Sequence, residues 1–177
     1  MSKVRYAVSG LEHPGWEEQY YPEDIPDDWK LAYYSNDFPA IVMTVEQALD
    51  DEFVDQLDDI PAGFRVYVLV NEELGGNQRA ELEDVLGGYF GGFIVKNNDL
   101  ANFAAHILAQ PVEGPFQAPV EVVRIAKMPD LKQLKQYLLT LQSQLGQNDV
   151  LFWLDDEQVA IESFQQLKTL LELMAIA

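Results

Sequence analysis

The sequence contains no cysteine, and this absence excludes disulfide bonds, thiolate catalysis and cysteine-ligated zinc or iron–sulfur centres. Histidine is also scarce, because His13 and His106 are the only two among the 177 residues. Carboxylates and these two imidazoles are therefore the remaining candidate metal ligands. From the sequence we assign no metal site and no cofactor.

Positive charge is equally sparse, with 11 lysines and arginines against 30 aspartates and glutamates and a formal net charge of −19. Such a field repels phosphate backbones and anionic lipid surfaces, so we expect neither direct nucleic-acid binding nor membrane association. The acidic residues are dispersed along the chain, which favours a solubilising coat. A basic protein partner and an acidic nucleic-acid mimic are the functional alternatives.

Long apolar runs are missing as well. No segment approaches the roughly 18 to 20 apolar residues that a membrane span needs, and Met1 to Val4 lack the pattern of a secretory signal. We therefore expect a cytoplasmic protein. A length of 177 residues and a hydrophobic content of 48% suit one α/β domain over residues 1–177 with a sizeable core.

Short β-rich segments alternate along the chain with segments of helical periodicity. The expected strands cover residues 3–9, 40–44, 64–70, 89–95, 120–126 and 150–154. The expected helices cover residues 27–38, 45–57, 77–86, 99–108, 130–145 and 157–176. Six strand–helix units call for a mainly parallel sheet joined by right-handed crossovers.

The length of the chain limits how far this sheet can close. A closed barrel of eight strand–helix units takes about 250 residues, so the chain is about two units short. We expect a reduced or open TIM-barrel-like fold, with a doubly wound open sheet as the alternative. The proline-rich segment from Pro111 to Pro119 is expected to be a connection within the domain.

Several local signals fix the ends of these elements. Thr44 and Gln47 have the spacing of a capping box, Asp130 can cap the helix that follows it, and Gly87 suits a helix C-terminus. Glu121 and Arg124 interrupt the apolar pattern of residues 120–126, which suggests an edge or partly exposed strand.

The last expected helix has an unusually wide apolar face. Leu170, Leu173 and Ile176 extend the stripe formed by its other apolar residues. This helix is expected either to be deeply buried or to be shared with a second subunit of a homodimer.

The carboxyl ends of parallel strands meet at one rim of an α/β fold, and binding sites lie there. The loop after the first strand brings His13 to this rim, and the last strand brings Asp155 and Asp156. These three residues are the catalytic candidates. In the alternative interpretation, His13 is a surface histidine in an acidic loop and the two aspartates cap the final helix.

The same rim argument supplies candidates for ligand binding. Lys96 and Asn97 follow the fourth strand, and Lys127 follows the fifth. Trp16 and Tyr21 lie in the first loop, where their rings could line a pocket or cover apolar surface. Ser9, Gly10 and Glu12 are expected at the rim too.

Both ends of the chain resemble the YecE-like family, a group of TIM-barrel-like proteins of unknown function. The opening match runs through Ser9, Gly10, Trp16, Tyr21-Pro22-Glu23, Pro26, Leu31, Tyr33-Tyr34 and Phe38, and the closing match through Leu151 to Asp156, Ala160 and Leu167. The two matches cover about a third of the chain. The resemblance implies a barrel fold and a rim site but no particular reaction.

The chain departs from the family pattern at specific positions. Val42 stands where the family has a glutamate in its second strand, Asp155 and Asp156 replace asparagines, and most of the long middle of the family barrel is missing. Loss of the glutamate favours a non-catalytic binding or interaction protein, for a small molecule or a basic protein partner. The alternative is a hydrolase-like or metal-assisted enzyme for a small molecule that uses His13 with Asp155 and Asp156.

Overall fold

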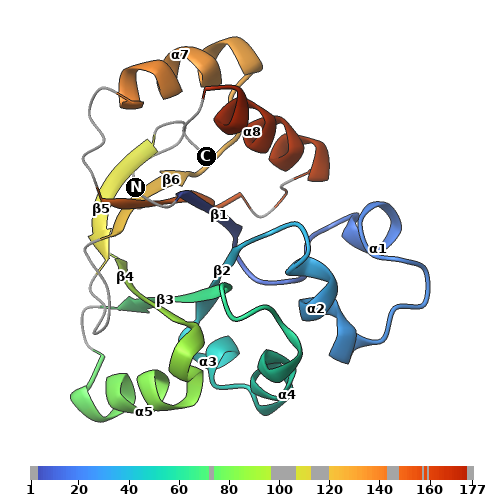
Figure 1. Ribbon diagram of the computed structural model, residues 1–177, viewed down its shortest axis with the longest axis vertical. Helices are drawn as coiled ribbons and strands as arrows, with labels where there is room; N and C mark the ends of the chain where they lie inside the picture. The colour runs from blue at the N-terminus through green and yellow to red at the C-terminus, as the bar shows by residue number, and fades with distance from the viewer. Residues whose placement is uncertain are drawn as a thin grey trace.

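The computed structural model is an α/β fold in which strands surround a common axis and helices cover the outside (Figure 1). It describes residues 4–71, 74–96, 107–112, 120–142, 148–156, 158 and 160–174. The described strands are β1 (Val4–Val8), β2 (Ala40–Thr44), β3 (Arg65–Asn71), β4 (Phe90–Lys96), β5 (Ile107–Val112), β6 (Val120–Ile125) and β7 (Asp149–Leu154).

Most helices of the first half are short, and longer ones follow. The α-helices are α1 (Trp16–Gln19), α2 (Lys30–Tyr34), α3 (Val45–Ala48), α4 (Asp51–Asp55), α5 (Gly76–Leu86), α7 (Leu131–Gln142) and α8 (Ile161–Leu173). The 3₁₀ helices are η1 (Asp27–Trp29), η2 (Gln56–Asp59) and η3 (Gly87–Tyr89). Among the described residues, no helix is long and apolar enough to span a membrane.

The strands form two sheets that meet at the ends of β1 and β2. One sheet has the order β1-β7-β6-β5 and the other β2-β3-β4, and all pairs are parallel except β5 with β6. Among the described residues, one isolated parallel bridge, from Ser9 to Val42, joins the sheets, and the Gly10 amide donates to the Val42 carbonyl at 2.9 Å. Gly10 has a φ of 71°, a conformation that favours glycine. The barrel is therefore open and reduced, as the length of the chain predicts.

Side chains on the strands alternate between the barrel interior and the helical layer, as the period of two requires. The interior cluster consists of Ala7, Ala40, Val42, Tyr67, Ile94, Val120, Val122, Leu151 and Trp153. The intervening residues, such as Val8, Ile41, Val66, Val123 and Phe152, pack against the helices in the larger core cluster. An interior residue can therefore be recognised by counting in twos along a strand.

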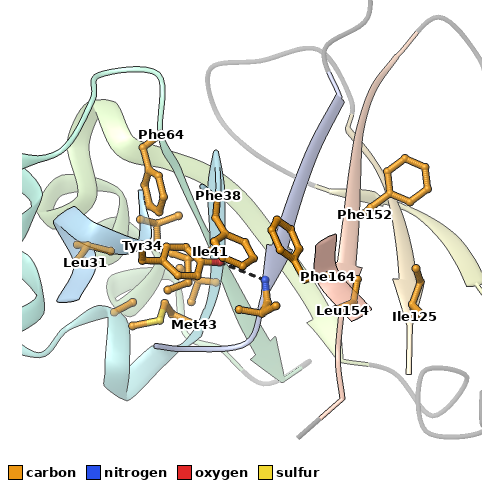
Figure 2. Close-up of a cluster of buried hydrophobic side chains, with 14 of the residues drawn as sticks. Leu31, Tyr34, Phe38, Ile41, Met43, Phe64, Ile125, Phe152, Leu154 and Phe164 are labelled. Carbon is orange, nitrogen blue, oxygen red and sulfur yellow. Dashed lines mark hydrogen bonds between the residues drawn. The ribbon is translucent and has the colours of Figure 1, made fainter. Parts of the chain in front are cut away.

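Stacked rings connect the first and last parts of the chain in the outer core. The Phe38 ring stacks on Tyr34 at 4.2 Å and on Phe164 of α8 at 3.8 Å, between ring centroids. Figure 2 shows these rings beside Leu154, Ile125 and Phe152. The buried Tyr34 hydroxyl accepts from the Val8 amide at 3.3 Å and donates to the Ala40 carbonyl at 2.9 Å. This packing holds the first loop against the barrel wall.

The local signals in the sequence are largely confirmed. Thr44 and Gln47 form the capping box, and Asp130 Oδ1 accepts from two amides at the start of α7. Gly87 ends α5 with a φ of 48°. Strand β2 has the predicted bounds, and the other predicted strands agree with the structure to within one residue at each end.

Four predictions about elements are wrong. Ile107 and Leu108 belong to strand β5 rather than to the end of a helix, while residues 99–106 lie outside the described part of the chain. Pro111 and Val112 end strand β5 rather than opening a connection, while residues 113–119 lie outside the described part of the chain. Strand β6 pairs with both β5 and β7 and so is not an edge, but the other alternative, a partly exposed strand, is confirmed by the half-buried Glu121 and Arg124. The helix expected over 45–57 is broken into α3, α4 and η2, since Asp50 starts a new helix by capping the Phe53 amide. The last helix begins at Ile161 rather than near residue 157.

The prediction of a homodimer through the last helix stays a prediction. Leu173 on α8 is 77% exposed, whereas Leu167 and Leu171 are buried. The helix therefore covers the barrel with one stripe and leaves one large apolar side chain outside it.

Candidate functional site

A hydrogen-bonded network occupies the carboxyl-terminal mouth of the barrel. Trp153 Nε1 donates to Ser9 Oγ at 2.8 Å, and the Ser9 hydroxyl donates to Asp155 Oδ1 at 3.2 Å. Arg124 Nε donates to Asp155 Oδ2 at 2.7 Å, and its Nη2 forms an ion pair with the same oxygen. The Arg124 guanidinium also lies 5.6 Å from the centroid of the Trp153 ring. Three strand ends are thereby tied together at the rim.

This network determines what Asp155 can do chemically. Both of its carboxylate oxygens are engaged, one by a hydroxyl and one by a guanidinium, so Asp155 joins the ends of β1 and β6 at the rim. The alternative interpretation, in which Asp155 caps the last helix, is wrong because that side chain bonds across the barrel. Asp156 instead accepts the Gln158 amide at 3.0 Å, in the turn before α8.

His13 lies beneath the first loop rather than at the surface of it. It is 8% exposed, and its ring centroid lies 4.4 Å from that of Trp16. Burial lowers the pKa of His13, while a hydrogen bond to the Gly10 carbonyl and the charge of Asp156 raise it by smaller amounts. Within the described residues Nε2 has no hydrogen-bond partner. His13 is therefore near Asp156 but is not hydrogen-bonded to it.

Trp16 and Tyr21, the aromatic candidates for ligand binding, are both part of the core. Trp16 is 1% exposed and packs on Phe38 and Tyr20. The Tyr21 hydroxyl donates to the Leu11 carbonyl at 2.8 Å, and its ring contacts Trp16 and Tyr33. Their rings stabilise the first loop by covering apolar surface. A role for them in ligand binding stays a prediction.

The remaining candidates are only partly placed. Lys127 is exposed in the bend after β6, and Lys96 is the last residue of β4. The Lys96 side chain, Asn97 and His106 lie outside the described residues. In the described part of the chain, no group of three or more histidines, aspartates and glutamates is arranged to hold a metal ion.

A pocket of about 570 Å³ opens at the rim beside the junction of β1 and β2. Its floor includes Ser9, Gly10 and Met43, and its walls come from the first loop, α2, α3 and α4. The acidic residues that line it are Glu12, Asp27, Glu46, Asp50 and Glu52. Of the residues that the sequence places at this rim, Ser9, Gly10 and Glu12 line this pocket.

Lys30 is the one cation among the described residues that line the pocket, and two carboxylates already balance its charge. Lys30 Nζ forms ion pairs with Glu17 Oε1 and Asp27 Oδ1, each at 2.8 Å. Hydrogen bonds to these two carboxylates raise the pKa of Lys30. The ammonium therefore stays protonated near neutral pH without offsetting Glu12, Glu46 or Glu52. The pocket keeps a strongly negative potential.

Sequence reasoning missed two groups of site residues. Arg124 was interpreted as exposed, although it stands two residues after the interior Val122 and therefore points to the barrel axis. Trp153 follows the same count of two along β7, and so does Asp155 just beyond it, which the sequence did place at the rim. No signal in the sequence connects Lys30 or Glu52 to the rim, because these residues reach the pocket only through the packing of α2 and α4 on β2.

Comparison with solved structures finds a DUF72 family protein from Thermotoga maritima, which is YecE-like and has a TIM-barrel-like fold. The TM-score is 0.56 and the sequence identity 13%, with 96% of this chain and 99% of that chain covered. The likeness therefore extends over the whole fold rather than over its two ends alone. At this identity it establishes the fold and nothing about activity. No family model matches the sequence, and no curated protein matches it either.

Proposed function

We propose that this chain is a non-catalytic binding protein that takes an ammonium or guanidinium group into the acidic pocket at the carboxyl-terminal rim. The pocket beside Ser9, Gly10 and Met43 is the observation that carries the proposal. It combines a hollow of about 570 Å³, a position where α/β barrels bind ligands, and an excess of carboxylates. The group bound there belongs either to a small organic cation or to a side chain of a basic protein.

The charge of the whole molecule supports the same ligand class. A net charge of −19 attracts cations over distances of about 8 Å at physiological salt and further at low salt. Glu12, Glu46 and Glu52 are exposed at the pocket, so a ligand can displace water from them without breaking bonds within the fold. Asp50 differs from them because it also caps α4.

The arrangement of the barrel mouth argues against the hydrolase-like or metal-assisted alternative. Asp155 is engaged by Ser9 and Arg124, and His13 makes no described hydrogen bond to either rim aspartate. Val42, which replaces the glutamate of the YecE-like pattern, is buried in the apolar interior cluster. Among the described contacts, His13 therefore forms no acid and base pair with Asp155 or Asp156, the partners that this alternative requires.

Isothermal titration with spermidine and with a lysine- and arginine-rich nonapeptide tests this proposal. The triple variant Glu12→Gln, Glu46→Gln, Glu52→Gln should weaken binding between about threefold and about 150-fold, since three exposed ion pairs of about 0.2–1 kcal/mol each contribute about 0.6–3 kcal/mol together. The matched control removes three exposed acids elsewhere, in Glu81→Gln, Glu162→Gln, Glu172→Gln. Equal weakening by both triple variants would show that only net charge matters and would overturn the proposal.

A second hollow distinguishes the two sources of the cation. Trp29, which is 64% exposed, lines a groove of about 560 Å³ with Tyr33 and Pro61 on another side of η1 and α2. A basic peptide that spans both hollows would contact this ring, whereas spermidine in the acidic pocket would not. Loss of peptide affinity alone in Trp29→Ala would indicate a protein partner, and unchanged affinity for both would indicate a small cation.

A further inference from the structure

Polar side chains form a layer at the amino-terminal end of the barrel interior, opposite the rim. Arg5, Arg65 and Asp149 each stand two residues before a member of the interior cluster, namely Ala7, Tyr67 and Leu151. They therefore point to the barrel axis. Arg5 Nη1 and Asp149 Oδ2 form an ion pair at 3.3 Å, and the Arg5 side chain is buried.

The hydroxyl of Tyr67 lies among these charges. Tyr67 is 0% exposed, and its ring presses on β4, where a Cβ at Gly91 would lie 2.9 Å from it. Burial raises the pKa of Tyr67 most and Asp149 raises it further, whereas the guanidinium groups of Arg5 and Arg65 lower it, Arg5 both by its charge and by directing an N–H toward the hydroxyl oxygen. The Tyr67 hydroxyl is thus within electrostatic reach of both arginines.

Two donors in this layer have no acceptor in the part of the chain that the structure describes. The Tyr67 hydroxyl and Arg65 Nε are buried without a hydrogen-bond partner among the described residues. Arg65 Nη1 is satisfied by the Ala62 and Phe64 carbonyls, and Asp149 is the carboxylate that faces Arg5. Among the described residues, two guanidinium groups and one hydroxyl thus face one carboxylate and the two carbonyls that Arg65 Nη1 already uses. Each buried donor without an acceptor costs about 1–3 kcal/mol of stability, so a water molecule or a ligand normally supplies the missing acceptor.

We propose that the amino-terminal end of the barrel interior binds a small oxyanion between Arg5, Arg65 and the Tyr67 hydroxyl. An oxyanion such as phosphate, sulfate or a carboxylate has several acceptor oxygens and one or two negative charges. It therefore supplies both the missing hydrogen-bond acceptors and the missing negative charge. Arginine is suited to this task because its guanidinium binds such groups through two parallel hydrogen bonds. Ala40, on the strand between Arg5 and Arg65, contributes neither an acceptor nor much bulk.

This site is separate from the acidic pocket in both place and charge. The pocket lies at the carboxyl ends of β1 and β2, whereas Arg5 and Arg65 lie at the opposite ends of β1 and β3. A ligand here would stabilise the barrel by holding the amino ends of β1, β3 and β7 together. Failure of one proposal therefore leaves the other intact.

Thermal unfolding in phosphate, sulfate and malonate tests the oxyanion site. Because a chain of charge −19 gains stability from any salt, each oxyanion is compared with sodium chloride at equal ionic strength. An oxyanion at about ten times its Kd should raise Tm by about 3 °C above the chloride reference. Tyr67→Phe keeps the ring and removes the hydroxyl, so it should abolish at least half of this difference.

Two further variants complete the test. Arg65→Lys keeps a positive charge but removes Nε, and it should also reduce the oxyanion effect. Tyr33→Phe, which removes a tyrosine hydroxyl outside the barrel, should leave the effect unchanged. The proposal is overturned if no oxyanion exceeds chloride, which would mean that water satisfies these donors. It is equally overturned if the excess survives both Tyr67→Phe and Arg65→Lys. Should Tyr67→Phe not fold, ³¹P line broadening of phosphate by wild type and by Arg65→Lys decides between these outcomes.

Discussion

Trp153 and Ser9 are joined by a hydrogen bond of 2.8 Å from the indole Nε1 to the hydroxyl oxygen, across 144 positions of sequence. Ser9 also forms the bridge to Val42 that connects the two sheets. A single small residue therefore contacts the last strand and the second strand at once. Its position explains how an open barrel keeps its first and second halves in register at the rim.

Replacement of this serine tests its part in the network. Ser9→Ala leaves the buried Trp153 Nε1 without its acceptor and removes a donor to Asp155, so it should cost about 1–3 kcal/mol of unfolding free energy. Urea denaturation followed by tryptophan fluorescence measures this loss. Ser35→Ala is a suitable control, because the Ser35 hydroxyl bonds only a local carbonyl of its own helix. A loss in Ser9→Ala no larger than in the control would contradict the network.

The ion pair of Arg124 and Asp155 predicts strong coupling between two substitutions. Arg124→Met leaves Asp155 partly buried without its counter-ion and should cost about 2–4 kcal/mol, a little less than for a fully buried pair. Adding Asp155→Asn to that variant should restore part of the loss. A double-mutant cycle should give an interaction energy of about 1–3 kcal/mol. Simple additivity of the two effects would show that the pair contributes nothing.

The sequence predicts the alternation of strands and helices well because period, caps and turn residues are local signals. Thr44 with Gln47 and the glycine at position 87 each act within a few residues. Arg124 shows where this reasoning stops. A charged residue in a strand looks exposed until the strand is known to face a barrel interior that contains Asp155 and Trp153, which lie about 30 residues away in sequence. The acidic pocket depends in the same way on the packing of short helices.

His13 predicts a specific pH dependence of stability. Because burial lowers its pKa in the folded state, the unfolded chain binds the proton more readily at mildly acidic pH. The neutral form therefore stabilises the fold fully above the unfolded pKa near 6.5, and this stabilisation is lost as pH falls through the folded pKa. Between pH 7.5 and 5.5, wild type should lose more stability than His13→Gln, measured by denaturation at each pH. An equal or smaller loss in wild type would show that His13 is not shielded from water.

Gly91 predicts an interaction with the Tyr67 ring. A methyl group at position 91 would lie 2.9 Å from that ring, so Gly91→Ala should cost about 1–3 kcal/mol. The cost should be clearly smaller when Tyr67 is also changed to leucine. Gly88→Ala is the control, since no heavy atom lies within 4 Å of a Cβ there and the change should be nearly neutral. Similar losses of stability in Gly88→Ala and Gly91→Ala would show that the Tyr67 ring does not contact position 91.

The central claim is that the acidic rim pocket, rather than the acidic surface as a whole, binds cations. Its most direct test is a spermidine titration of ¹⁵N-labelled protein in about 150 mM salt, where dispersed surface attraction is largely screened. The account predicts saturable shifts concentrated at the amides of Gly10, Gln47 and Phe53, which line the pocket, and their loss in the Glu12→Gln, Glu46→Gln, Glu52→Gln variant. Shifts spread evenly over the exposed acidic residues, or no shifts at all, would contradict it.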